Sequence, residues 1–320
     1  MYRYIIKRIL MLIPVLLGAT FIVFCIMDLT PGDPARIILG AEASAEDIEN
    51  LREELGLNRP LLVRYFSYIG GVVQGDLGTS YRNNISVSSQ IAERLPNTFL
   101  LAFSGMLVAI IIGIPVGIIS AKRQYTVFDY VSMVFALIGA SAPVFWVGLI
   151  MVIAFSLHLG WFPSSGMGEG FFGVLRSLVL PATTLGISVT ALVARMTRSS
   201  MLEVIRQDYI DTARSKGLKD SIITWRHMMK NALIPIITVV GLQFGALLGG
   251  SVMTETVFAW PGLGRFVVEA INTRDTPAVL GSVVVFAVSF SIVNLLVDIL
   301  YAFADPRIKS QYRAVRRFAK

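Results

Sequence analysis

Few residues of this 320-residue chain could carry out catalysis or bind a metal. The two histidines, His158 and His227, are far apart, and Cys25 is the single cysteine, so the sequence offers neither paired metal ligands at i, i+4 nor a disulfide framework. The dipeptide Gly-Lys does not occur, which excludes a phosphate-binding loop of the GxxxxGK[ST] type, and no Gly-x-Ser-x-Gly signature lies near a plausible base. The sequence therefore predicts no catalytic residue, no metal site and no cofactor held by this chain.

Charged residues gather instead in one internal segment, residues 195–230, which lies between two apolar runs. The segment holds eight Lys or Arg residues and four Asp or Glu residues. Burying these charges in lipid would cost tens of kcal/mol, at about 2.5–3.5 kcal/mol each. The segment must therefore lie in water or at the headgroup surface.

The spacing of apolar residues in the first half of this segment predicts a helix. Met201, Ile205, Tyr209 and Ala213 recur every four residues, which places them along one helix face. Gly217 follows, and glycine is the favoured residue where a helix ends in a left-handed turn. We expect one helix that ends at a glycine corner.

A second, short amphipathic helix is expected after the corner, with Asp220 or Ser221 as its N-cap. Ile222, Trp225 and Met229 would share one face of this helix, which leads into the next apolar run. Two interpretations fit this pattern: an interfacial helix that lies on the membrane, or a helix that docks on a cytosolic partner. The residue pattern alone does not decide between them.

The apolar runs before and after this segment are predicted to be membrane spans. Hydrophobic residues make up 55% of the chain and charged residues only 15%, against about 25% in soluble domains. A membrane-spanning helix needs about 20 apolar residues. Six runs qualify: 9–27, 95–121, 130–168 with its apolar part ending near 159, 177–194, 231–254 and 276–297. The predicted fold is an all-α polytopic membrane protein with six transmembrane helices.

The distribution of Lys and Arg predicts the orientation of these spans. With the N-terminus inside, the inside segments hold 19 basic residues and the outside segments hold 9. Both termini are therefore expected to be cytoplasmic. A net charge of +7 that is distributed by membrane side does not favour a nucleic-acid partner.

This topology divides the chain into four parts. Residues 1–27 form an N-terminal segment and the first span, 28–94 an extracytoplasmic helical segment, 95–304 a transmembrane core that includes an extracytoplasmic loop at 255–275, and 305–320 a basic cytoplasmic tail. Within the second part, Ser44 and Gly56 bound a predicted helix, and "LLVRYFSYIGGVV" forms a second amphipathic stretch. This part is either a cap on the other spans or a surface for an outside partner.

Polar residues inside the spans are the remaining functional candidates. Gln243 and Ser251 lie in or at the end of the fifth span, and Asn294 lies in the sixth. They are candidates for a translocation pathway or for contacts between subunits. Serine and threonine in spans more often bond their own helix or join helices together.

Five dispersed stretches make the chain resemble a known family. Asp211-Thr212-Ala213 with Gly217 resembles the Glu-Ala-Ala-x-x-x-Gly signature of permease subunits in ATP-binding-cassette (ABC) importers, with aspartate replacing glutamate and threonine replacing alanine. The form "YIDTARSKGL…RH…NALIP" looks like the peptide and nickel branch, of the dipeptide and oligopeptide permease "B" type. The five stretches are "PGDPARIILG", "GDLGTSYRNN", "RMTRSSMLEV", "MTETVFAWPGLGRF" and the terminal "NLLVDILYAFADPRI", and together they cover nearly the whole chain.

The resemblance implies roles for particular residues. Residues 195–235 would be the segment that couples to the ATPase. Its coupling residues would be Asp211, Ala213, Gly217, Trp225 and Arg226. All of these except Ala213 are expected to matter most for docking. The stretch between the fifth and sixth spans would form an extracytoplasmic rim facing a substrate-binding protein. Its candidate residues are Glu255, Trp260, Pro261 and Gly262. A plain Pro-Gly turn that joins two helices is the alternative for this stretch.

The resemblance also implies a function. The chain would be a permease subunit in a prokaryotic plasma membrane and would form half of the pathway for short peptides delivered by an extracytoplasmic binding protein. Its partners would be a second homologous permease subunit, two cytosolic ABC ATPases that bind ATP and Mg, and the lipid bilayer. The alternative is a secondary transporter driven by an ion gradient, which predicts charges inside the spans or inverted repeats. The sequence does not decide among dipeptide, oligopeptide, glutathione and nickel as substrate, nor between a heterodimer and a homodimer.

Overall fold

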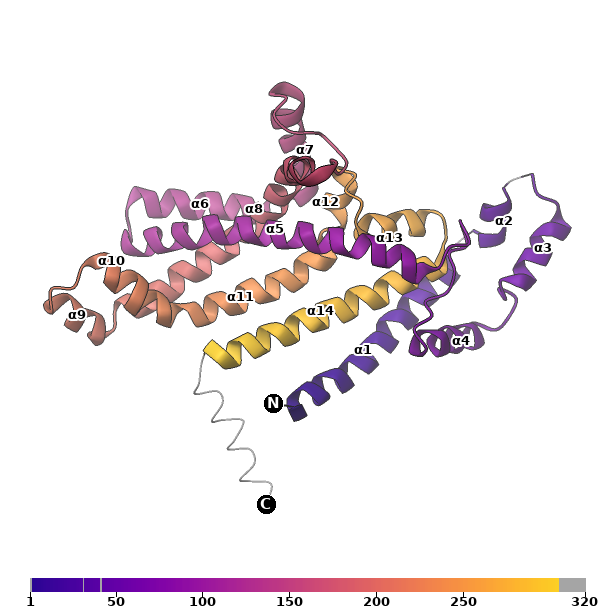
Figure 1. Ribbon diagram of the computed structural model, residues 1–320, viewed down its shortest axis with the longest axis horizontal. Coiled ribbons are helices and arrows are strands. Elements are labelled where there is room, and N and C mark those ends of the chain that lie inside the picture. The colour runs from indigo at the N-terminus through magenta and orange to yellow at the C-terminus, as the bar shows by residue number, and fades with distance from the viewer. Residues whose placement is uncertain (1, 31, 41, 305–320) are drawn as a thin grey trace, which may run out of the picture. The chain divides into compact units, whose positions relative to one another are not determined.

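The structure, a computed structural model, describes residues 2–30, 32–40 and 42–304, so the predicted tail 305–320 lies outside the described residues. The described part is mainly helical and contains no strand. Figure 1 shows the helices in chain order. They are α1 (Tyr2–Leu29), α2 (Pro34–Leu39), α3 (Ala45–Glu54), α4 (Leu61–Val73), α5 (Val87–Lys122), α6 (Val127–Ser141), α7 (Val144–Met151), the π-helix η1 (Val152–His158), α8 (Gly170–Ile205), α9 (Asp208–Ser215), α10 (Asp220–Ile222), the π-helix η2 (Ile223–Met228), α11 (Met229–Gly250), α12 (Val252–Val257), α13 (Leu263–Asn272) and α14 (Thr276–Ala304).

The predicted spans correspond to long apolar helices, with one difference. Five helices of the described residues are long and apolar enough to cross a membrane. The third predicted span is instead two helices, α6 and α7–η1, bent by 104° at a short break. Pro143 lies at this break as the N-cap of α7, where proline holds the residue before it out of the helical region. Counting the bent pair as one span gives up to six spans.

The fourth predicted span is also longer than its apolar run of 18 residues. α8 covers 36 residues, because the helix already begins at Gly170, before the apolar run, and continues past Ala194 to Ile205. Charge ends the apolar run but does not end the helix, since arginine has a high helix propensity.

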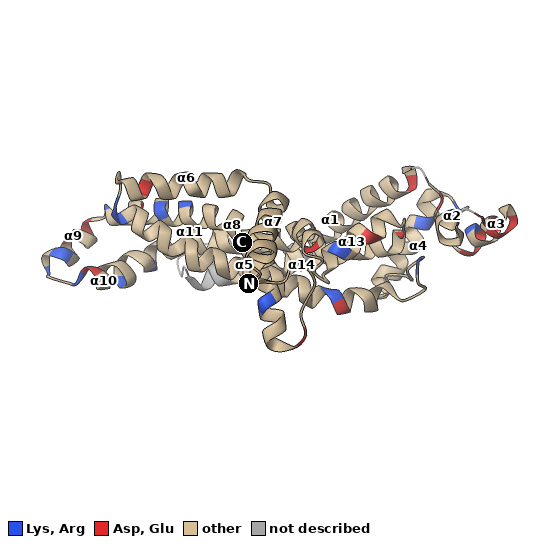
Figure 2. Cartoon of the chain, turned by 90° about the horizontal axis from the view of Figure 1, so that it is seen from above, with Lys and Arg blue, Asp and Glu red and all other residues tan. Residues whose placement is uncertain are grey.

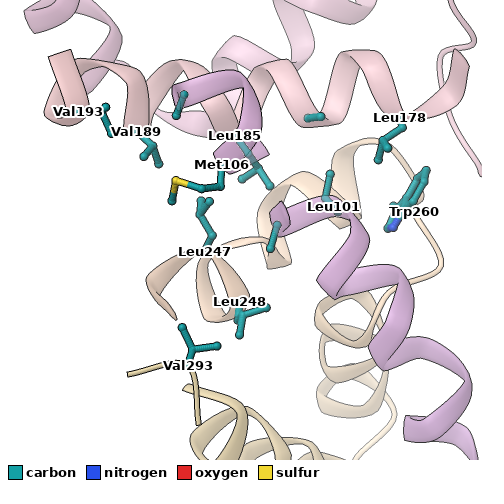
Figure 3. Packing of buried hydrophobic residues seen from close by; sticks show 13 residues of the cluster. Leu101, Met106, Leu178, Leu185, Val189, Val193, Leu247, Leu248, Trp260 and Val293 are labelled. Atoms are coloured by element: carbon teal, nitrogen blue, oxygen red, sulfur yellow. The ribbon is translucent and has the colours of Figure 1, made fainter. Parts of the chain in front are cut away.

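The chain forms two compact units, and each is described by itself. The larger unit comprises residues 99–260 and 290–304 of the described chain. Its main hydrophobic cluster joins α5, α8, α11 and α14, and Figure 3 shows the side chains that meet there. Leu101 of α5, Leu185 of α8, Leu248 of α11 and Trp260 are each at most 1% exposed.

Two helices of this unit, α5 and α8, approach each other closely through glycines. A Cβ added to Gly117 would lie 2.6 Å from the Ala194 carbonyl oxygen, and one added to Gly186 would lie 2.7 Å from Val108 Cβ. No side chain fits at these distances, so the two backbones lie in direct contact over several turns. Close helix packing of this kind is a device of membrane proteins.

The smaller unit comprises residues 2–98 and 261–289. Within it the predicted helices after the first span are confirmed. Ser44 is the N-cap of α3, and its hydroxyl accepts a hydrogen bond from the Asp47 amide at 3.1 Å. Gly56 follows α3 with φ +66°, the left-handed conformation expected of a terminating glycine. The stretch "LLVRYFSYIGGVV" coincides with α4.

Asp275 connects two parts of the smaller unit that are far apart in the sequence. Its carboxylate is 3% exposed and accepts hydrogen bonds from the Ser80 hydroxyl, from the Tyr81 amide at 3.1 Å and from the Ala278 amide at 3.3 Å. The stretch "GDLGTSYRNN" is thus held against the start of α14. We call this arrangement the Asp275 joint.

Candidate coupling site

One side of the candidate coupling segment, residues 195–235, is buried against the core of the larger unit. Ile210 and Ala213 of α9 and Ile223 and Met228 of η2 are at most 6% exposed. They join one hydrophobic cluster with Met201 of α8 and with the ends of α5 and α11. The segment is therefore anchored in the same core as three long helices.

The single helix expected over residues 201–213 is broken in the structure. α8 ends at Ile205, Arg206 is its C-cap, and α9 begins at Asp208 after the extended residue Gln207. The four-residue spacing holds on each side of the break, but Tyr209 is 41% exposed whereas Met201 and Ala213 are buried. The prediction of one continuous helix was wrong, because the extended residue Gln207 separates the long helix α8 from the eight-residue helix α9.

Gly217 forms the corner predicted for it. Its φ is +72°, and its amide donates to the Arg214 carbonyl oxygen at 2.9 Å. A Cβ added here would meet no atom within 4 Å, so packing does not require glycine. The backbone conformation does, because a left-handed residue with a side chain costs about 1–2 kcal/mol.

The second helix of the segment departs from its predicted register. Ile222 is 40% and Trp225 is 62% exposed, as a shared face predicts, but Met229 is only 8% exposed. The reason is η2, whose π-helical turns accommodate more residues than an α-helix does. This turn rotates the following residues, so Met229 faces the core. The N-cap is Lys219, and Asp220 opens the helix.

The outward face of the segment combines apolar and charged side chains. Leu218, Ile222 and Trp225 are 38%, 40% and 62% exposed, and Arg226 is exposed beside them. Figure 2 shows the charged residues of this region on α9 and α10, whereas α11 is mostly uncharged. Exposed apolar side chains rimmed by charge are typical of a surface that binds a partner.

Asp211 and Ala213, two of the predicted coupling residues, have different surroundings. The Asp211 side chain is 70% exposed and pairs with Arg214 at 3.1 Å. Ala213 is 6% exposed and belongs to the hydrophobic cluster under the segment. Its role in coupling stays a prediction.

Two polar contacts tie the segment to the helices around it. Lys122 at the end of α5 forms an ion pair with Asp220 and lies 3.2 Å from the Thr224 hydroxyl. The Asn231 amide nitrogen donates to the Tyr209 hydroxyl at 2.9 Å and links α11 to α9. Both helices that flank the corner are thereby connected to spans.

A buried ion pair below the segment was not predicted. Arg198 Nε and Nη2 donate to the two carboxylate oxygens of Asp129 at 2.7 Å each, and Ser120 donates to the same carboxylate. The Asp129 side chain is 3% and the Arg198 side chain 24% exposed. This cluster joins α5, α6 and α8 at one level. Thr126, the N-cap three residues before Asp129, is the sequence signal that could have pointed to this aspartate as a buried capping residue.

The predicted pathway residues lie within the larger unit. Ser251 is fully buried, and its hydroxyl lies 2.9 Å from Glu255 Oε1. Asn294 lies across from Gly245, and its Oδ1 is buried without a hydrogen-bond partner among the described residues. Gln243 is half-buried. An unpaired buried amide oxygen keeps Asn294 a candidate for a contact with substrate or with another subunit.

The predicted rim residues are mostly interior. Glu255 and Trp260 are 0% exposed, and Gly262 is buried as the N-cap of α13. The side chains of Glu255 and Trp260 therefore do not lie on the surface of this chain. Of the four predicted rim residues only Pro261 is exposed. The turn at Pro261 is therefore the part of this stretch that remains a candidate rim.

Comparison with known proteins identifies the family. Residues 113–310 match the family described as binding-protein-dependent transport system inner membrane component, and residues 1–102 match the N-terminal region of such membrane components. The chain is 45% identical to a dipeptide transport system permease protein, DppB, of Alkalihalophilus pseudofirmus, over 97% of this chain and 100% of the relative. It is 44% identical to the oligopeptide transport system permease protein AppB of Bacillus subtilis, over 97% and 100%. It is 42% identical to the glutathione transport system permease protein GsiC of Escherichia coli K12, over 97% and 99%.

Solved structures show the same fold. An inward-facing MetNI methionine ABC transporter matches with a TM-score of 0.57 at 19% identity, over 68% of this chain and 96% of the matched chain. An amino acid ABC transporter with histidines matches with a TM-score of 0.52 at 15% identity, over 67% and 94%. The resemblance of the sequence to ABC importer permeases is confirmed. The chain belongs to the family of inner membrane components of binding-protein-dependent transport systems.

Proposed function

We propose that this multi-pass membrane protein forms one half of the translocation pathway of an ABC importer for short peptides. The relatives named for dipeptide, oligopeptide and glutathione transport support this substrate class. The partners would be a second homologous permease, an extracytoplasmic binding protein that delivers the peptide, and two cytosolic ATPases that hold ATP and Mg. The complex would reside in a prokaryotic plasma membrane.

The candidate coupling segment would transmit the movement of an ATPase to the spans. The observation that carries this proposal is the two-sided character of the segment. Its outward face exposes Trp225 at 62%, while Ile210 and Met228 on its underside are buried in the core. A partner that moves the outward face must therefore move the spans.

The energetics of coupling follow from population shift. A partner changes the populations of inward-open and outward-open states only by as much as it prefers one of them. Moving an equilibrium from 1:99 to 99:1 takes about 5.5 kcal/mol of differential binding. Two ATPases that each dock on one such segment would share that requirement.

Photo-crosslinking of the assembled complex tests the docking proposal. A photoreactive amino acid replaces Leu218, which is 38% exposed at the corner. The matched control replaces Phe172, which is 83% exposed near the start of α8. We expect crosslinks to the ATPase from position 218 both with and without ATP, and none from 172. A complete lack of ATPase crosslinks from 218 in every nucleotide state would refute the proposal.

Uptake in proteoliposomes separates this function from transport driven by an ion gradient, which the relatives do not favour. The complete complex and its binding protein are reconstituted with a labelled dipeptide outside and ATP on the side of the ATPases. We expect uptake that depends on ATP and persists when ionophores collapse the ion gradients. Uptake abolished by ionophores in the presence of ATP would support the ion-gradient alternative.

A further inference from the structure

The helix α4 of the smaller unit presents an apolar face that no described residue covers. Leu62, Val63, Phe66 and Val73 are 55%, 51%, 65% and 82% exposed. With 13 residues, α4 is apolar but too short to cross a membrane. A helix with such a face is stable only where something apolar meets it.

Contacts made by Tyr65 hold α4 against a candidate membrane span. The Tyr65 hydroxyl donates to the Leu17 carbonyl oxygen at 2.8 Å and lies 3.1 Å from the Thr20 hydroxyl. Its ring packs edge-on against Phe21 and Phe24, at 5.1 and 5.7 Å between centroids. All four partners belong to the candidate span Leu10–Leu29, and Figure 1 shows α4 beside α1. α4 therefore packs against a candidate span through Tyr65, and this contact leaves its apolar face exposed.

A cavity of about 140 Å³ opens at the polar side of α4. Its lining contains two arginines and several hydroxyl groups but no Asp or Glu: Arg59, Arg64, Ser67, Tyr68, Tyr81 and Thr276. Another cavity of this unit has acidic residues, Glu269 and Asp275, beside its arginines. The cavity beside α4 is therefore suited to an anion.

The two arginines of this cavity differ in their partners. Arg64 pairs with Asp28 at 2.8 Å and lies over the Phe24 ring. Arg59 is exposed and forms no ion pair among the residues that the structure describes. One positive charge of the cavity is thus uncompensated within the described chain.

The hydroxyl groups of this cavity can donate to an anion. The Tyr68 hydroxyl is buried and has no hydrogen-bond partner among the described residues. Burial raises the pKa of Tyr81, so its phenol remains a neutral donor near neutral pH. Leaving a buried donor without a partner is unfavourable, and a bound acceptor would remove that cost.

We propose that α4 is an interfacial helix that binds the bilayer, and that the cavity beside it holds the phosphate of an anionic phospholipid headgroup. The apolar face contacts the acyl chains, while Arg59 and the hydroxyl groups contact the phosphate. A free phosphate ion would bind in the cavity but would leave the apolar face of α4 exposed. The continuity of the two surfaces on one helix favours the lipid. This inference does not depend on the cargo of the transporter.

Lipid binding by the purified full chain in detergent tests the cavity. The probes are dioleoyl-phosphatidylglycerol, dioleoylglycerol, which has the same chains without a phosphate, and inorganic phosphate, with bound lipid counted by native mass spectrometry. We expect phosphatidylglycerol to bind more tightly than dioleoylglycerol. Arg59→Gln should weaken phosphatidylglycerol binding about five-fold, the contribution of one arginine near an anionic surface. Arg82→Gln, in the other cavity, serves as the control and should change nothing.

Three results of this experiment would overturn the proposal. The first is equal binding of phosphatidylglycerol by the Arg59→Gln variant and the unmodified chain. The second is displacement of phosphatidylglycerol by inorganic phosphate at similar concentration, which would indicate a free-phosphate site. The third is its displacement by a short peptide, which would make the cavity a peptide site.

A spin-label measurement tests the helix face independently of the cavity. Phe66→Cys and, as control, Glu46→Cys on the exposed side of α3 are each labelled in a Cys25→Ser background of the full chain. In lipid nanodiscs we expect the label at 66 to be accessible to oxygen and protected from a water-soluble nickel chelate. The label at 46 should show the reverse. Equal nickel accessibility at both positions would overturn the lipid contact.

Discussion

The candidate coupling segment and the Asp275 joint are both polar connections between long helices, yet they use polar residues in opposite ways. In the coupling segment the charged side chains face outward, and Asp211 is 70% exposed in a surface pair with Arg214. In the joint the carboxylate faces inward, at 3% exposure, and accepts three hydrogen bonds. The first arrangement leaves a surface available for a partner, whereas the second closes a connection within the chain.

The difference shows that the position of a charge in the sequence says little about its role. Asp211 and Asp275 both lie in short polar stretches between apolar runs. Only the partners separate them, because a buried carboxylate must be hydrogen-bonded and an exposed one is solvated. Substitutions in the two regions should therefore differ in effect: those at the buried carboxylate should lower stability, and those in the coupling segment should impair uptake or binding of the ATPase.

The largest effect is expected from Asp275→Ala. The change removes an acceptor from the buried Ser80 hydroxyl, from the buried Ala278 amide and from the partly buried Tyr81 amide. We expect a loss of about 3 kcal/mol in the free energy of unfolding, since buried donors left unpaired cost about 1–3 kcal/mol each. Thermal unfolding of the purified chain measures it. Asp275→Asn keeps one acceptor oxygen and should lose less, so equal unfolding temperatures for all three proteins would refute the structural role.

Gly217→Val should have the next largest effect, on the corner of the coupling segment. A β-branched residue at φ +72° is strained by about 1–2 kcal/mol, although the space around it is open. We expect normal membrane insertion with a several-fold loss of ATP-dependent uptake. Gly217→Asn is the matched control, because asparagine tolerates the left-handed conformation and should retain most uptake. If valine and asparagine gave the same uptake, the conformation of the corner would not matter.

Trp225→Ala should affect docking without affecting stability. The side chain is 62% exposed, so its loss should change the free energy of unfolding by no more than about 0.5 kcal/mol. A tryptophan at the centre of a docking surface contributes roughly 2 kcal/mol to association. Binding of the ATPase to the reconstituted permease measures this contribution. Tyr130→Ala, which removes an aromatic side chain of 60% exposure on α6, should bind normally.

Asp211→Asn should have the smallest effect. Its ion pair with Arg214 lies at the surface, where such pairs contribute about 0–1 kcal/mol. We expect uptake within two-fold of the unmodified chain, and a larger loss for Asp211→Lys, which reverses the charge of the outward face. A loss of stability in Asp211→Asn comparable with that of Asp275→Ala would erase the distinction between the two regions.

The features that the sequence predicted correctly are those determined by residues close together in the chain. Apolar runs located the long helices, Ser44 and Gly56 bounded α3, and Gly217 marked a corner. The break at residues 206–207 and the π-helical turn η2 were missed, because each shifts the register through packing rather than composition. The buried pair of Asp129 and Arg198 was missed for another reason.

Long-range pairing carries no local signal in a single sequence. Arg198 is 69 residues from Asp129, and the Tyr81 amide is 194 residues from Asp275. Each aspartate reads as a solvated loop charge until its partner is known. The same limit applies to Glu255 and Trp260, which were expected at a surface and are fully buried.

The glycine contacts between α5 and α8 limit how motion can pass through the larger unit. With backbones touching at Gly117 and Gly186, neither helix can slide or repack against the other without a clash. A force applied at the Gly217 corner would rotate α5 and α8 together as one rigid body. The displacement of their far ends would then depend on the length of the helices and on the position of the rotation axis, and not on the rearrangement of side chains.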